Sequence, residues 1–135
     1  MEHGGIALFK ISKTISPVLF VFSHFIKVYN ENLVKSTDIG QKKLVQISQK
    51  LQDEAEFYQK YVSHSDANFE ASLNLLGLVL MLLNRCDEAE IYFQKAIQIK
   101  RMSDFSYGNL GSLYAQLRKK TEADEALKMA VNFNS

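Results

Sequence analysis

Histidine and cysteine side chains come first in a search for chemistry, because they ligate metals and act as bases or nucleophiles. The chain has three histidines and one cysteine, at His3, His24, His64 and Cys86. Their spacing is not that of the ligands of a structural metal site. A single cysteine also forms no internal disulfide. We therefore expect no metal site and no cofactor.

Clusters of charge are the second place where chemistry could arise. Acidic residues stand at 87, 88 and 90 and again at 122, 124 and 125. Both clusters open apolar periodic stretches, where negative charge stabilises a helix N-terminus, so we interpret them as helix starts. The run Arg118-Lys119-Lys120 is interpreted as a solvated turn, with contact to a phosphate or an acidic partner as the alternative. No catalytic group is predicted, and the chain is not expected to be an enzyme.

Composition narrows the class of partner. Sixteen Lys and Arg balance fifteen Asp and Glu over 135 residues, for a formal net charge of +1. Nucleic-acid-binding domains carry a marked basic excess, so no nucleic acid partner is expected. One proline and six glycines argue against a turn-dense sheet fold and against disorder. A chain of this length buries a core without disulfides.

A repeat of 34 residues organises the second half of the chain. Residues 70–103 and 104–135 align without gaps. Gly77 and Gly111 share one position, although glycine inside a helix costs about 1 kcal/mol relative to alanine. We infer that each glycine permits the close approach of two helices. Apolar side chains recur in the same phase, namely Leu73 with Tyr107, Leu76 with Leu110, Leu80 with Tyr114, Ala89 with Ala123, Phe93 with Leu127, Ala96 with Ala130 and Ile99 with Phe133.

Signals for helix boundaries follow the same frame. Ser103 is placed to cap the helix that follows it. Asp87 and Thr121 are predicted to cap the second helix of each repeat, each with an acidic residue three positions later. Asn84 falls at the turn inside the first repeat, where asparagine tolerates a left-handed backbone. Each repeat is thus predicted to be a helical hairpin.

This pattern resembles the tetratricopeptide repeat family. Leu76-Gly77 and Asn109-Leu110-Gly111 resemble the signature of its first helix, and Ala89 with residues 92–97 resembles that of its second. The resemblance covers residues 70–135. It departs at the helix ends, where Arg101 replaces the usual proline and Asn84 and Arg118 replace the usual glycines. It implies an all-α fold, a solenoid of stacked helical hairpins that binds other proteins.

The same resemblance bears on the lone cysteine. Cys86 stands at a position that the family usually fills with an apolar residue. A packing role is therefore implied, and a reactive thiolate beside Arg85 is the alternative.

The residues before the repeats resemble a worn copy of the same hairpin. The stretch 54–60 parallels 88–95 with one residue lost. We predict a helix over 38–62, with Asp38 as candidate cap, and a partner helix over 17–34. Helical spacing of apolar residues supports the longer helix, at Leu44, Ile47, Leu51, Ala55, Tyr58 and Val62. The predicted organisation is a flexible tail at 1–16, a degenerate hairpin at 17–66 and two repeats at 67–135. About six helices in three hairpins suit a solenoid, since fewer than about three repeats are marginal.

The apolar N-terminal segment has more than one interpretation. Ser16 as N-cap and Pro17 at the first helical position favour a buried helix. Its apolar stripe comprises Val18, Phe22, Phe25, Ile26, Tyr29 and Leu33. The run is shorter than the about 20 apolar residues of a membrane span, and no clear signal-peptide cleavage site follows. A buried helix is preferred, and a membrane contact through residues 15–29 or a secretory signal is the alternative. The expected compartment is accordingly the cytoplasm, with the membrane or the secretory pathway as the alternative.

The family resemblance also implies where a partner binds, because the first helices of its repeats line a concave groove. By position, the groove comprises Asn74, Leu78, Met81, Leu82, Phe105, Asn109, Ser112 and Gln116. The first-repeat members are mostly apolar, which suits a hydrophobic peptide or an amphipathic helix. Asn109 matches the family's asparagine that hydrogen-bonds a ligand backbone. The basic set that clamps acidic chaperone tails has no counterpart, so such tails are not expected to bind tightly.

Three functional hypotheses follow. The leading one is an adaptor or scaffold module that binds a protein or peptide in the groove without chemistry of its own. The alternatives are a membrane-associated assembly factor anchored by the N-terminal segment and the recognition arm of a larger complex or enzyme.

Two apolar surfaces of the repeats have more than one possible cover. Residues 75–83 are apolar all round, so the N-terminal helix could fold back and occupy the groove in place of a partner. Ala126, Met129 and Phe133 of the C-terminal helix have no further repeat to cover them, which predicts self-association or, as the alternative, that the chain is a piece of a longer repeat protein.

Overall fold

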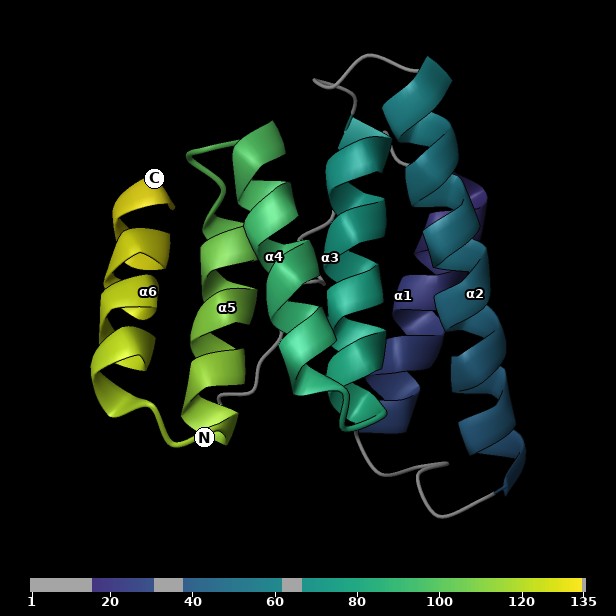
Figure 1. Cartoon of the computed structure of the whole chain (residues 1–135), viewed down its shortest axis with the longest axis horizontal. Coiled ribbons are helices and arrows are strands. Elements are labelled where there is room, and N and C mark those ends of the chain that lie inside the picture. Colours follow the sequence, from purple (N-terminus) through teal and green to yellow (C-terminus); the bar gives the residue numbers. More distant parts are fainter. Residues whose placement is uncertain (1–15, 31–37, 62–66, 135) are drawn as a thin grey trace.

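The computed structural model describes residues 16–30, 38–61 and 67–134, and all the regular structure in these ranges is helical. The six helices are α1 (Pro17–Asn30), α2 (Asp38–Tyr61), α3 (Ala67–Leu82), α4 (Cys86–Ile99), α5 (Asp104–Gln116) and α6 (Lys120–Phe133). They stand side by side in a row that runs from α1 and α2 to α6 (Figure 1). The predicted all-α class with six helices is confirmed for the described residues.

The last four helices form two antiparallel hairpins, α3 with α4 and α5 with α6. Their turns use the same backbone solution one repeat apart, with Asn84 at φ 62° and Arg118 at φ 61°. The amide of the next residue returns to the first helix in both, from Arg85 to Leu80 O at 2.7 Å and from Lys119 to Tyr114 O at 2.9 Å. The left-handed conformation predicted for Asn84 is confirmed. Arginine has no side-chain feature that favours this conformation, so the turn itself imposes it.

The helix starts confirm one predicted cap and contradict two. Ser103 caps α5, because its hydroxyl accepts a hydrogen bond from Ser106 N at 3.2 Å. Asp87 and Thr121 do not cap α4 and α6, which begin earlier, at Cys86 and Lys120. The residues before these helices make no side-chain capping bond. The left-handed turn residue brings the chain into the helix at once, so the predicted caps fall inside its first turn.

The two mid-helix glycines do provide the close approach that was inferred from the sequence. A β-carbon at Gly77 would overlap the ring of Phe93 on α4, and one at Gly111 would lie 2.7 Å from a methyl group of Leu127 on α6. Real β-carbons keep longer distances, so the first and second helices of each hairpin meet closer than alanine permits. Phe93 is fully buried and Leu127 is 42 % exposed, which makes the two contacts unequal.

Helices α1 and α2 each pack on α3 more extensively than on each other. On α1 the buried side chains are Leu19, Phe22, Ile26 and Tyr29, and on α2 they are Leu44, Ile47, Leu51 and Ala55. Tyr58 of the predicted α2 stripe is half-buried, and Leu33 and Val62 lie outside the described residues. Val18 was wrongly assigned to the core. It is 49 % exposed and Leu19 is buried instead, because the buried stripe begins at Leu19, three residues before Phe22.

The start of α1 follows the sequence prediction. Ser16 Oγ accepts a hydrogen bond from Leu19 N at 3.2 Å, and Pro17 occupies the first helical position. Ser16 N in turn donates to Asn68 Oδ1 at the start of α3, at 2.8 Å, which fixes α1 beside α3. In the described residues, no helix is long and apolar enough to cross a membrane. The apolar character of α1 is used, at least on one side, to cover α3.

The free edge of α6 differs from the equivalent edge of α4. Phe93 and Leu127 are equivalent residues, as are Ile97 and Val131. Helix α5 packs against α4, where Phe93 is buried and Ile97 half-buried, whereas on α6 Leu127 is 42 % and Val131 73 % exposed. Of the residues expected to be uncovered, Ala126 is buried in the core and Phe133 contacts Tyr107 in a tilted arrangement, with ring centroids 5.6 Å apart. Met129 does lie on the surface, with 36 % exposure.

Candidate functional site

A buried polar network joins the first helices of the two repeats, α3 and α5. Asn109 Nδ2 donates to Asn74 Oδ1 at 3.1 Å. Asn74 Nδ2 donates to Ser106 Oγ at 3.0 Å and to the backbone oxygen of Glu70 at 3.3 Å. The Ser106 hydroxyl donates to Glu70 Oε2 at 3.2 Å. All four side chains are buried, so this network fixes how α3 and α5 lie relative to each other.

One acceptor in the network is unsatisfied. Asn109 is 1 % exposed, and its Oδ1 has no hydrogen-bond partner in the described part of the chain. A buried polar atom without a partner costs about 1–3 kcal/mol, and such atoms are rare in folded proteins. The two predicted groove residues Asn74 and Asn109 are therefore brought together, and their shared network retains one spare acceptor.

The apolar residues predicted to line the groove are part of the core. Leu78 is 8 % exposed and belongs to the main core cluster, and Met81 and Leu82 are half-buried and pack against that cluster. A residue in this position stabilises the fold whatever else it contacts. Changing Leu78 to a charged residue would therefore unfold the protein and would report nothing about binding.

The accessible part of the predicted groove lies on α5. Phe105 and Ser112 are half-buried and Gln116 is exposed. Gln116 is near the turn of the first hairpin, where its amide donates to Cys86 Sγ at 3.7 Å. The α5 part of this surface is mixed in polarity; on α3, Leu78 is buried, and Met81 and Leu82 are half-buried.

Burial shifts two titratable groups, Cys86 and Tyr114, toward their protonated forms. Burial raises the pKa of the half-buried Cys86 thiol, with a smaller contribution from Asp87, so the thiolate is disfavoured. Cys86 also packs against the core cluster. The Tyr114 hydroxyl donates to Glu90 Oε2 at 2.6 Å, and burial together with this carboxylate raises the pKa of Tyr114 to about 12. No group of three or more His, Cys, Asp or Glu in the described residues could hold a metal ion.

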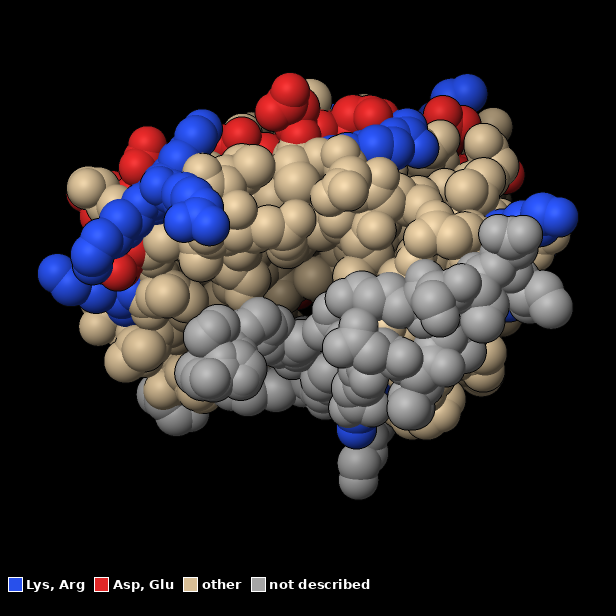
Figure 2. All heavy atoms as spheres, turned by 90° about the horizontal axis from the view of Figure 1, so that it is seen from below, with Lys and Arg blue, Asp and Glu red and all other residues tan. Residues whose placement is uncertain are grey.

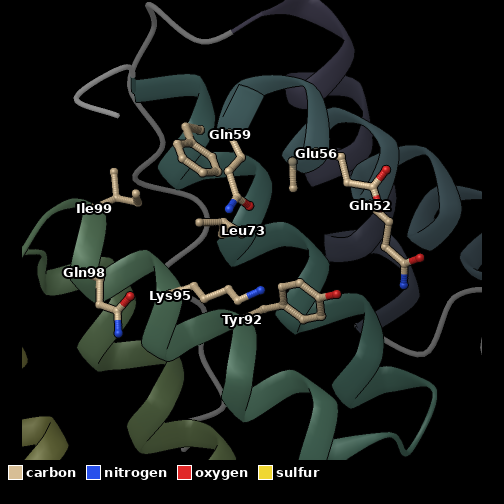
Figure 3. A pocket seen from close by; sticks show the side chains of 10 residues that line it. Gln52, Glu56, Gln59, Leu73, Tyr92, Lys95, Gln98 and Ile99 are labelled. Atoms are coloured by element: carbon tan, nitrogen blue, oxygen red, sulfur yellow. The ribbon is translucent and has the colours of Figure 1, made fainter. Parts of the chain in front are cut away.

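Sequence reasoning missed a cleft between α2 and α4, with α3 as its floor (Figure 3). We call it the α2–α4 cleft; its volume is about 450 Å³. It is lined by Gln52, Ala55, Glu56, Gln59, Phe69, Leu73, Tyr92, Lys95, Gln98 and Ile99. Leu73 and Ile99 were identified only as repeat positions. The cleft could have been suspected from the sequence, because Leu73 and Ile99 are smaller than their equivalents in the second repeat, Tyr107 and Phe133.

Charge is distributed unevenly over the molecule. Seen from below, acidic side chains stand along one long edge, and basic side chains gather most at the end where α5 and α6 lie (Figure 2). The α5–α6 turn carries Arg118, Lys119 and Lys120, all exposed. Among these, Lys119 Nζ lies 5.9 Å from the ring centre of Tyr114. The visible face between the two charged zones is largely uncharged.

Comparison with known families identifies the two hairpins. A family model described as Tetratricopeptide repeat matches residues 71–102, and a second model with the same description matches residues 106–135. These ranges correspond to α3 with α4 and α5 with α6, and six helices packed pairwise are the arrangement of such repeats. Residues 71–135 therefore carry two tetratricopeptide repeats. No individual curated protein and no solved structure matches the chain. Repeats of this family are protein–protein interaction modules, so the class of partner is protein.

Proposed function

We propose that the chain binds a peptide segment of another protein along the exposed side of α5, next to its contact with α3. The observation that supports this most directly is the unsatisfied Oδ1 of Asn109. A backbone N–H of a bound peptide satisfies this acceptor and recovers the cost of leaving it unpaired. The family's use of an asparagine at this position for the same purpose agrees with that assignment.

The proposed contact surface differs from a purely apolar groove. Its accessible residues are Phe105, Ser112 and Gln116, which offer one aromatic ring, one hydroxyl and one amide. Such a surface suits an extended peptide held by its backbone, with one apolar side chain over Phe105. An amphipathic helix is less suited, because Leu78 is enclosed by the core and Met81 and Leu82 pack against it.

A selection experiment tests this proposal. A library of random 12-residue peptides is selected on the immobilised full chain, and each binder is measured against variants. We expect Ser112→Arg and Gln116→Arg to weaken binding by 10-fold or more, since they place a long charged side chain on the surface. Glu125→Arg, on the exposed part of α6, is the control and should leave binding unchanged. Binders that keep their affinity for both α5 variants would overturn the proposal.

A second candidate contact is the outer face of α1. Val18, Phe20 and Val21 are 49, 64 and 62 % exposed there, although the other side of the helix is buried. An apolar row on a helix is the feature by which a protein lies on a bilayer interface, as the membrane-associated alternative requires. Flotation of the full chain with neutral phospholipid vesicles tests it. Cofloating protein that is lost in Phe20→Ser and Val21→Ser supports this candidate, and wild-type protein left at the bottom of the gradient excludes it.

A further inference from the structure

The α2–α4 cleft lies on a different side of α3 from the proposed peptide surface. Leu73 and Phe69 of α3 form its floor together with Ala55 of α2, and all three are buried. The rim consists of longer polar side chains, three of them glutamines, at Gln52, Gln59 and Gln98. An apolar floor with a few polar groups around it is the usual composition of a ligand site, and the volume of about 450 Å³ falls in the usual size range.

The second repeat shows what this cleft lacks. Leu73 and Ile99, which line it, are equivalent to Tyr107 and Phe133 one repeat later. Those two rings are in contact between α5 and α6, tilted by 48° with centroids 5.6 Å apart. At these two positions the first repeat has smaller aliphatic side chains, which line the cleft, whereas Phe69 and Tyr92 of the same lining stand where the second repeat has Ser103 and Ala126. An aromatic ring inserted over Leu73 and Ile99 would restore the aromatic contact that the second repeat makes at these positions.

We propose that the α2–α4 cleft is a second recognition site, which takes an aromatic side chain of a partner protein. The ring enters over Leu73 and Ile99, where Phe69 and Tyr92 offer edges and faces for aromatic contact. The backbone on either side of the inserted residue meets the glutamine amides of the rim. Each amide can both donate to a peptide carbonyl and accept from a peptide N–H.

The rim is available for such contacts. The side chains of Gln52, Gln59 and Gln98 make no hydrogen bond within the described part of the chain. Lys95 Nζ lies 5.3 Å from the ring centre of Tyr92, and Figure 3 shows both side chains beside the mouth of the cleft. An ammonium group held there also attracts the electron-rich face of an incoming ring. The site is therefore selective for aromatic over aliphatic residues.

The probe for a test is N-acetyl-phenylalanine amide, titrated into the isotopically labelled full chain while backbone amide shifts are recorded. We expect saturable shifts at Leu73, Tyr92 and Ile99, with a dissociation constant on the order of 1 mM, as befits so small a ligand. N-acetyl-alanine amide should give no saturable shift. An absence of saturable shifts with the aromatic probe, or shifts confined to Ser112 and Gln116 of α5, would overturn the proposal.

The internal repeat supplies matched variants. The double change Leu73→Tyr with Ile99→Phe installs the side chains of the second repeat and should weaken binding at least 10-fold. The reverse change, Tyr107→Leu with Phe133→Ile, opens the second repeat and should raise the number of bound probes from one to two. Gln98→Trp, at an exposed rim position, blocks the mouth and decides the case if the filled variant does not fold. Unchanged binding in Gln98→Trp, or in a folded filled variant, would overturn the proposal. The α5 variants Ser112→Arg and Gln116→Arg should bind the probe normally, which separates this site from the proposed peptide surface.

Discussion

The substitution of alanine for glycine should have opposite effects at the two equivalent positions 77 and 111. Replacing glycine inside a helix gains about 1 kcal/mol from backbone entropy at either position. The added methyl group must then find room. At Gly77 it meets the ring of Phe93, which is fully buried, and at Gly111 it meets the end of the Leu127 side chain, which is 42 % exposed.

The gain in backbone entropy and the cost of overpacking together decide whether each variant is more or less stable than wild type. A buried ring has nowhere to move, so the overpacking cost at Gly77 should reach about 3 kcal/mol and leave a net loss of about 2 kcal/mol. Leu127 can rotate toward solvent at little cost, so Gly111→Ala should be neutral or more stable than wild type by up to about 1 kcal/mol. A chain of this length changes its melting temperature by about 3–4 °C per kcal/mol, so the two variants should differ by roughly 7–10 °C.

Thermal and urea unfolding, followed by far-ultraviolet circular dichroism, measure this difference. The control is Gly77→Ala with Phe93→Leu, which gives the first repeat the leucine that the second repeat has at the equivalent position, Leu127. It should recover part of the loss, because the leucine side chain is more adaptable than the ring. The reasoning is refuted if Gly77→Ala is as stable as Gly111→Ala, or if the leucine makes Gly77→Ala less stable still.

Three further outcomes are expected. Ser106→Ala should lower the free energy of unfolding in urea by about 1–3 kcal/mol, because the buried Asn74 and Glu70 lose a hydrogen-bond partner. The control is Ser112→Ala, at a half-buried position, which should cost almost nothing. Equal losses in the two variants would contradict the assigned network. The pKa of Tyr114 is raised to about 12 in the folded state, so the stability that it contributes is complete below pH 10 and is lost as the pH rises from 10 to 12. Between these pH values the unfolding free energy of wild type should fall more steeply than that of Tyr114→Phe, and parallel curves would show that Glu90 does not hold this proton. Finally, the exposed Leu127 and Val131 should give concentration-dependent self-association in sedimentation. Val131→Glu should abolish this association, and the control Asn132→Glu, which places the same charge on the same helix, should not. A wild type that stays monomeric excludes this edge as an interface.

The sequence was informative wherever one residue type answers one local requirement. A serine hydroxyl before a helix, an asparagine in a left-handed turn and a glycine under a neighbouring ring are each decided within a few residues. Ser103, Asn84 and Gly77 could therefore be assigned from the sequence alone. The repeat then carried these assignments to equivalent positions and fixed the all-α class.

The predictions that failed depended on quantities that the sequence pattern does not contain. Asp87 and Thr121 have suitable side chains for caps, but the turn conformation decides where the helix starts and places each of them two residues after the N-cap position. Val18 fits the apolar stripe as well as Leu19 does, and only the rotation of α1 against α3 distinguishes them. Leu78 fits a groove as well as a core, and the neighbouring helices determine which it joins. The α2–α4 cleft arises from three helices together, so no single stretch of sequence displays it.

The central place of α3 has a consequence for the nascent chain. Helices α1 and α2 leave the ribosome before α3, yet both find their main packing partner in α3 and pack little on each other. Between the end of α2 at Tyr61 and the end of α3 at Leu82, translation takes roughly 1–4 s. During that interval the apolar side of α1, with Leu19, Phe22 and Ile26, has nothing to cover it. The apolar sides of α1 and α2 therefore stay without their main packing partner until α3 has been made.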